Sequence, residues 1–191
     1  MKKTLPRTDS EFRQRRADLF RELALESDRG AVLVGASLLE ECLELVLRSV
    51  MRREEKIVKR VVDGLFEGAG ALSTFSAKTK CCFALNLIDE MAFVDLETIR
   101  LMRNEFAHSY RKASFLNQDI GDMVNSLHTG KLFEDRISAS GDGGLILEDG
   151  KPAIKMPEAK RKLIVSVSFL GSYFEAHTRG FDDLLGQRTT H

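Results

Sequence analysis

Hydrophobic residues recur every three or four positions along most of the chain, which is the spacing of one face of an α-helix. The pattern is strongest in residues 29–52, where apolar side chains also occupy much of the opposite face. Glu40, Glu41 and Glu44 form the polar edge of this segment. A helix that is apolar on most of its circumference lies among other helices. We therefore expect residues 29–52 to be the central helix of a bundle, with a stripe of Ala31, Val34, Leu38, Cys42, Leu45 and Ser49.

The same periodicity predicts further helices on both sides of the central one. Ser76 and Asp95 each precede an apolar repeat and are expected to be helix N-caps. Short connections between helices favour antiparallel neighbours. The expected fold class is all-α, an antiparallel bundle of about seven helices. The additional helices cover residues 8–27, 54–63, 76–91, 96–110, 119–127 and 157–185.

The segment from Gly130 to Pro157 has a different pattern. Asp149 and Gly150 lie between two short apolar runs, and an Asp-Gly turn in that position is typical of a β-hairpin. We expect a small hairpin at residues 143–155, appended to the bundle. The length suits one helical domain, residues 1–191. Within it we expect a core at 29–128, a loop and hairpin at 130–156, and a C-terminal helix at 157–185.

Charge and cysteine content narrow the functional classes. The 191 residues include 29 Lys and Arg and 29 Asp and Glu, so the net charge is zero. Proteins that coat nucleic acids or bind membrane surfaces need an excess of cations, so only a local basic patch is compatible with such a role. The three cysteines are odd in number and two of them are adjacent, so a disulfide framework is not expected. They form no CxxC pair, so a zinc site is not expected either. We expect no metal or other cofactor.

The N-terminal residues are basic and lead into charged residues, which does not fit a signal peptide. Every apolar run is interrupted before it reaches the length of a membrane span. We therefore expect a cytoplasmic protein without a membrane partner.

The strongest candidate for chemistry is the segment Arg103-Asn104-Glu105-Phe106-Ala107-His108. An arginine that holds phosphoryl oxygens, beside a histidine that titrates near neutral pH, is what RNA cleavage without a metal requires. Asn104 would orient the phosphate or the histidine. The structural alternative is a salt-bridged arginine and a histidine that caps the last helical turn. This segment resembles the Arg-x4–6-His signature of HEPN domains, helical bundles of which many are ribonucleases that form their site across a homodimer. Others bind RNA or act as scaffolds.

A second candidate is the basic run that contains Arg52, Arg53, Lys56, Lys59 and Arg60. It is either a solvated helix face or a binding surface for RNA or a protein partner. We find no pair of helices that presents basic and amide side chains to a DNA groove. Direct DNA binding is therefore not expected.

Several separate pieces of the chain also resemble the mannitol operon repressor family. They are Leu38-Leu39-Glu40, the run from Asp63 to Leu72, the run from Ser76 to Lys80, and Met102 to His108, in that order. The resemblance spans residues 30–128 and implies a helical regulator that acts through a protein partner, as a homodimer. Glu40 lies where the resemblance is best, and its carboxylate is the candidate that would orient His108 or pair with Arg103. The structural alternative is that Glu40, with Glu41 and Glu44, forms a solvated edge of the central helix.

Two hypotheses follow. The first is a regulatory protein of the mannitol repressor type that is not an enzyme. The second is a HEPN-like endoribonuclease or RNA-binding module that uses Arg103 and His108.

Overall fold

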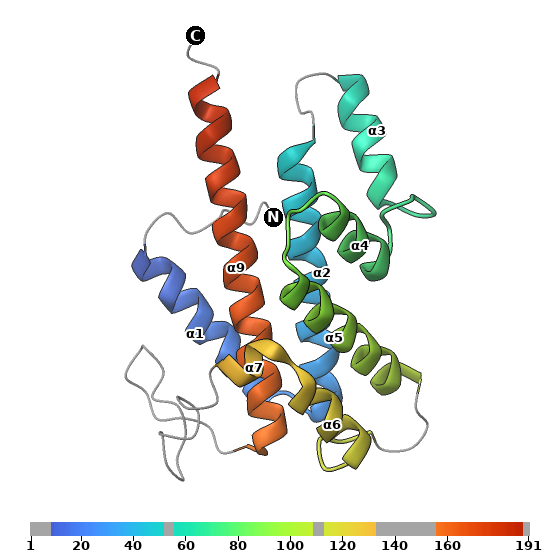
Figure 1. The fold of residues 1–191 in the computed structure, drawn as a ribbon, viewed down its shortest axis with the longest axis vertical. Helices are drawn as coiled ribbons and strands as arrows, with labels where there is room; N and C mark the ends of the chain where they lie inside the picture. The colour runs from blue at the N-terminus through green and yellow to red at the C-terminus, as the bar shows by residue number, and fades with distance from the viewer. Residues whose placement is uncertain (1–8, 52–55, 109–112, 133–155, 189–191) are drawn as a thin grey trace.

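A computed structural model of the chain describes residues 9–51, 56–108, 113–132 and 156–188. These residues form eight helices and no strand (Figure 1). The all-α class predicted from the sequence is confirmed, and the expected hairpin at 143–155 lies outside the described residues. No helix in the described ranges is long and apolar enough to cross a membrane. The helices are α1 (Asp9–Leu25), α2 (Asp28–Val50), α3 (Lys56–Phe66), α4 (Phe75–Ala84), α5 (Glu90–His108), α6 (Gln118–Ser126), α7 (His128–Leu132) and α9 (Glu158–Arg188).

Helix α2 is central, because α1, α4, α5 and α9 all pack against it. Figure 1 shows α9 running alongside α2, with α4 and α5 on the other side. Gly35 permits the close approach of α2 and α9. A Cβ atom at Gly35 would lie 3.2 Å from Cγ2 of Val167, which is tighter than an ordinary contact, whereas one at Gly171 would lie at an ordinary 3.6 Å from Cδ2 of Leu38. The absence of a side chain at Gly35 therefore lets the backbone of α2 lie against the Val167 side chain of α9.

The prediction that residues 29–52 form the central helix is confirmed, but the predicted stripe is partly wrong. Val34 and Leu45 are exposed, whereas Leu39 and Leu43 are completely buried. Apolar residues occupy most of the circumference of α2, so the periodicity alone did not distinguish its buried faces from its outer face. The packing of the four neighbouring helices determines which faces of α2 are buried.

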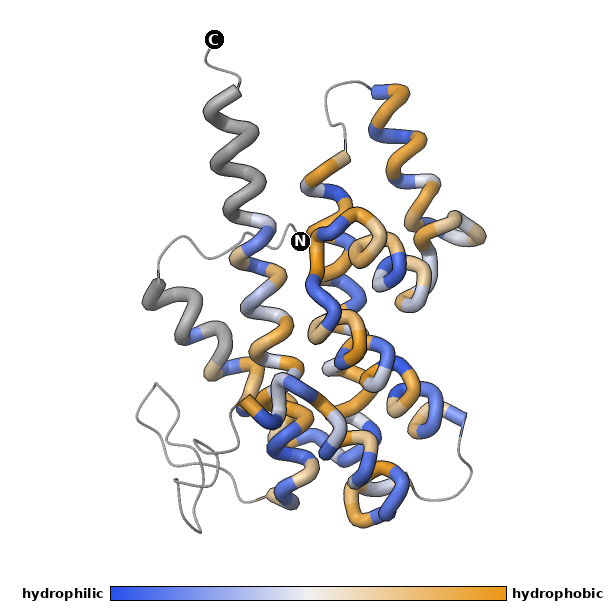
Figure 2. Tube along the Cα trace, in the orientation of Figure 1, coloured by the Kyte–Doolittle hydropathy of each residue, from blue (hydrophilic) through white to orange (hydrophobic). Residues whose placement is uncertain are grey.

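One hydrophobic core connects α1, α2, α4, α5, α6 and α9. Leu23 of α1, Leu39 of α2, Phe106 of α5 and Phe174 of α9 are almost completely buried in it. Figure 2 shows hydrophobic positions alternating with hydrophilic ones along these helices. Helix α3 contributes mainly Phe66, at its C-terminal end, and packs more loosely against the rest.

The start of α5 differs from the expected one. The helix begins at Glu90, and the side chain of Asp89 accepts a hydrogen bond from the backbone N–H of Ala92 at 2.8 Å. The prediction that Asp95 is the N-cap of a helix at residues 96–110 is therefore wrong. Asp95 lies one turn inside α5.

The expected helix at 76–91 is wrong at both ends. Thr74 caps α4, because its Oγ1 accepts from the N–H of Ala77 at 3.2 Å, so Ser76 lies inside the helix. The helix ends at Ala84, and Asn86 has a φ of 56°. Asparagine tolerates this left-handed conformation, which breaks the helical path between α4 and α5.

A buried lysine joins the first described helix, α1, to the last one, α9. Lys160, in the first turns of α9, donates from Nζ to the carbonyl oxygen of Ala24 at 3.1 Å and to that of Glu26. These carbonyls lie at the C-terminal end of α1, where the last carbonyls of a helix have no partner within it. Lys160 thereby fixes the position of α1 on α9.

Candidate functional site

Helix α5 exposes both Arg103 and His108. Nη1 of Arg103 lies 3.4 Å from Oδ1 of Asn104, and His108 is the last residue of the helix. Five residues on a helix correspond to about 140° of rotation and about 7.5 Å along the axis. The side chains of Arg103 and His108 therefore leave α5 in different directions, and one chain alone does not bring them together.

The structure places Glu40 in a different environment from the predicted one. Its Oε1 accepts a hydrogen bond from Nζ of Lys78, a buried residue of α4, at 3.0 Å. Asp28, at the start of α2, accepts from Oγ of Ser114, beyond the end of α5, at 2.8 Å. Glu40 lies about 18 Å farther along the axis of α2. The described contacts of Glu40 therefore join α2 to α4, away from the C-terminal end of α5 where His108 lies.

Arg48 links α2 to α3. Its Nε donates to Glu44 at 2.9 Å, its Nη1 donates to Asp63 at 2.7 Å, and its Cζ lies 4.4 Å from the ring centroid of Phe66. Burial lowers the pKa of Arg48, but the hydrogen bonds to Asp63 and Glu44 outweigh this effect and raise the pKa above its usual value. Nζ of Lys78 lies 3.4 Å from Oε2 of Glu44. The acidic edge of α2 that the sequence shows is therefore occupied by cations from α2 and α4.

The predicted basic surface lies partly in the described structure. Lys56, Lys59 and Arg60 are exposed on α3, and none forms an ion pair with another described residue. Ile57 and Val61 are exposed beside them, by 67% and 58%. Arg52 and Arg53 lie outside the described residues. The exposure of these three cations fits both a binding surface and a solvated helix face, so both interpretations of the basic run stay open.

Asp95 forms a buried polar cluster, whose partners the sequence did not identify. The carboxylate is fully buried. Oδ1 accepts from the backbone N–H of His128 at 2.8 Å and lies 3.0 Å from its Nδ1. Oδ2 accepts from the N–H of Thr129 at 2.8 Å and from its Oγ1 at 2.6 Å. Since α7 begins at His128, Asp95 caps a helix that is distant in sequence.

The described residues contain no metal-binding cluster, and the buried Cys82 is not an activated thiol. Within the described ranges, no group of three or more His, Cys, Asp or Glu side chains is arranged to hold a metal ion. Cys82 is buried. Desolvation, and to a smaller extent the nearby Cys81, raises the pKa of the Cys82 thiol to about 12. A thiol with that pKa is protonated at neutral pH and is a poor nucleophile.

Comparison with known proteins decides the family. The mannitol repressor family matches residues 20–142, more than half of the chain. The chain belongs to the mannitol repressor family. Its relatives include the mannitol operon repressors of Escherichia coli K12 and of Escherichia coli O6:H1, each 27% identical over 100 residues. The alignment covers 52% of this chain and 51% of each repressor, so the chain spans about half the length of the curated relatives it matches.

Two solved structures share the fold of this mannitol repressor family member. One is a chain in the X-ray structure of the MtlR–HPr complex from Escherichia coli, with a TM-score of 0.63, 20% identity, and coverage of 86% of this chain and 98% of that chain. The other is YggD from Shigella flexneri, described as a possible transcriptional regulator, with a TM-score of 0.59, 14% identity, and coverage of 86% and 95%. The family resemblance drawn from the sequence is confirmed. The HEPN-like site and the homodimer stay predictions.

Proposed function

We propose that this mannitol repressor family member is a regulatory protein that is not an enzyme and that acts by binding a protein partner. The observation that carries the proposal is that a chain with this fold is found in a complex with HPr. Membership of the mannitol repressor family supports the regulatory role. The net charge of zero supports a protein partner over direct binding to DNA, because DNA binding depends on releasing counterions with an excess of Lys and Arg.

Calorimetric titration of the purified chain with Escherichia coli HPr tests this proposal. We expect saturable binding to HPr and no shift of mannitol operator DNA by the chain alone in a gel assay at physiological salt. Tight, sequence-specific binding of the operator DNA by the chain, together with no heat of binding to HPr, would overturn the proposal.

The second candidate function is metal-independent RNA cleavage or RNA binding. It is favoured by the exposure of Arg103 and His108 on α5 and by the exposed cations of α3. Since the two side chains diverge on one helix, the reaction would require a second copy of the chain to complete the site. In such a site, His108 would move the proton of a ribose hydroxyl and Arg103 would hold the phosphoryl oxygens. The 2′,3′-cyclic phosphate that this reaction leaves is its diagnostic product.

A further inference from the structure

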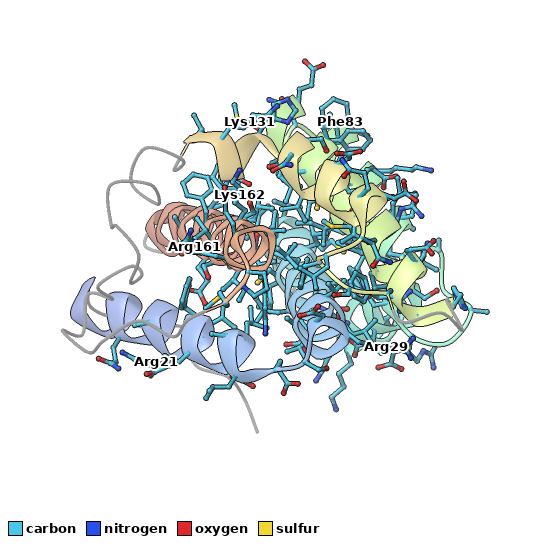
Figure 3. All side chains as sticks on the ribbon, turned by 90° about the horizontal axis from the view of Figure 1, so that it is seen from below. Arg21, Arg29, Phe83, Lys131, Arg161 and Lys162 are labelled. Carbon is cyan, nitrogen blue, oxygen red and sulfur yellow. The ribbon has the colours of Figure 1, made fainter. Side chains whose placement is uncertain are left out.

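The outer face of α5 and the adjoining end of α4 expose large hydrophobic side chains that the core does not use. Phe83 is 41% exposed, Leu85 53%, Val94 38% and Leu101 48%. The ring of Phe83 stacks on that of Phe93, with centroids 4.5 Å apart. Figure 3 shows Phe83 at the outer edge of the molecule. We call Phe83, Leu85, Val94 and Leu101, with the acidic residues around them, the α5 outer face.

Helical spacing places these residues of α5 on one side. Glu90, Val94, Leu101 and Glu105 follow one another at steps of four, seven and four residues, which keeps them within about 60° around the axis. The opposite side of α5 carries the completely buried residues Leu96, Ile99, Met102 and Phe106. The exposed side is therefore a second apolar surface on a helix whose core contacts are already complete.

The charges around this surface are predominantly negative. Asp89, Glu90 and Glu105 are exposed at its edges. Glu97 does not add to this charge, because Arg100 neutralises it through a close ion pair at 2.9 Å. Lys80, one turn before Phe83, is the exposed cation next to the aromatic pair. Exposed aromatic and aliphatic side chains with predominantly negative charges around them are compatible with a protein interface whose partner is predominantly positive.

Asp89, at the acidic edge of this surface, is fixed at the start of α5. Its side chain accepts a hydrogen bond from the backbone N–H of Ala92 at 2.8 Å. Burial, and then the charge of Asp89, raise the pKa of the Tyr173 hydroxyl of α9, while a hydrogen bond from the backbone of Asp89 lowers it.

We propose that the α5 outer face docks the protein partner of this family member, and that the partner presents apolar side chains surrounded by cations. This inference rests on the proposed function. The basic face of α3 has the opposite charge and exposes two hydrophobic side chains, Ile57 and Val61. It fits an acidic ligand and is therefore the natural comparison surface.

The test measures HPr binding by calorimetry for matched surface variants of the full chain. Leu101→Ser and the pair Glu90→Lys with Glu105→Lys change the α5 outer face. Ile57→Ser and the pair Lys59→Glu with Arg60→Glu make the equivalent changes on α3, where both cations are exposed. We expect the α5 variants to weaken HPr binding by about tenfold or more, as interface anchors do. We expect the α3 variants to change it less than about threefold.

Salt dependence separates charge complementarity from loss of apolar contact. Binding of the unchanged chain is expected to weaken as salt is raised, and the double charge reversal is expected to remove most of that dependence. Circular dichroism melts check that each variant folds. Surface substitutions usually change the free energy of unfolding by only about 0.5 kcal/mol, so each variant is expected to melt close to the unchanged chain.

The outcomes distinguish the two proposals. If the unchanged chain does not bind HPr, the proposed function fails and the docking assignment fails with it. If the chain binds HPr and only the α3 variants weaken binding, the docking assignment alone is overturned. If sedimentation shows a dimer that Leu101→Ser dissociates while HPr binding is unaffected, the occupant is a second copy of this chain, which also overturns the assignment.

Discussion

Asp95→Asn tests whether a buried carboxylate on α5 fixes α7. A carboxylate only accepts hydrogen bonds, so Nδ1 of His128 carries a proton directed at Asp95, along with the N–H groups of His128 and Thr129 and the hydroxyl of Thr129. The asparagine amide has nearly the same shape but retains one accepting oxygen. Its NH₂ group then faces two donors whose hydrogen bonds the second carboxylate oxygen accepts in the native protein. These two donors lose their acceptor.

The magnitude follows from the bonds that are lost. A buried donor without an acceptor costs about 1–3 kcal/mol, and replacing charged acceptors by a neutral one weakens the remaining bonds by about 1 kcal/mol each. The amide avoids part of the desolvation of the carboxylate, which offsets some of this cost. We expect Asp95→Asn to lower the free energy of unfolding by about 3 kcal/mol. For a chain of this size that corresponds to a decrease in Tm of about 6–12 °C.

Urea unfolding followed by circular dichroism at 222 nm measures this change. Asp122→Asn on α6 is the matched control, because Asp122 is exposed and its bond among the described residues comes from the Gln118 side chain at 3.0 Å. The control is expected to stay within about 0.5 kcal/mol of the unchanged chain. A double-mutant cycle of Asp95→Asn with Thr129→Val should show a coupling energy of about 1–2 kcal/mol. If Asp95→Asn is as neutral as the control, the assignment of Asp95 as the cap of α7 is refuted.

Three further predictions concern other parts of the molecule. In an RNA-cleavage assay with EDTA, the HEPN-like hypothesis requires a 2′,3′-cyclic phosphate product that both Arg103→Ala and His108→Ala abolish. Absence of cleavage by the unchanged chain, or full activity of either variant, contradicts it. Gly35→Val is expected to destabilise the chain by about 1–3 kcal/mol, because a Cβ there meets Val167 of α9 at 3.2 Å. Gly121→Ala has open space around it and is expected to stabilise α6 by about 0.5–1 kcal/mol in the same denaturation experiment, and equal effects of the two substitutions would contradict the packing. Since the pKa of Cys82 is about 12, its alkylation by iodoacetamide at pH 8 should occur only on unfolding. Peptide mass spectrometry distinguishes Cys82 from the partly buried Cys42 and Cys81, and rapid labelling of Cys82 itself in the folded chain would contradict its burial.

The fold class and the central helix could be predicted from the sequence because both depend on hydrophobic periodicity. Helix ends were less predictable because they depend on single residues. The left-handed conformation of Asn86 ends the path that the apolar pattern would have continued through it. The buried face of α2 could not be chosen either, since its apolar side chains cover most of the helix.

The candidate site shows a different limit of sequence reasoning. Arg103 and His108 are exposed, which the sequence left open. The interpretation of Glu40 depended on contacts between helices, and its carboxylate pairs with Lys78. Asp95 did have a detectable signal. It lies four residues before Ile99, within the apolar stripe of its helix, and a carboxylate in that position requires buried donors. The position of Asp95 in the apolar stripe indicates that buried hydrogen-bond donors exist, but the fold is needed to identify them as His128 and Thr129.

The bond between Lys160 and the end of α1 has a consequence for the biogenesis of the protein. The acceptors lie on Ala24 and Glu26, so the first helix cannot reach its native position until the last helix has been synthesised. The same holds for the side of α2 that packs against α9. During translation, the segment from α1 to α7 leaves the ribosome before α9 is made, so the side of α2 that packs against α9 is still uncovered. The native state therefore forms after translation of α9, and a chain that ends before α9 is expected to be a substrate for chaperones and proteases.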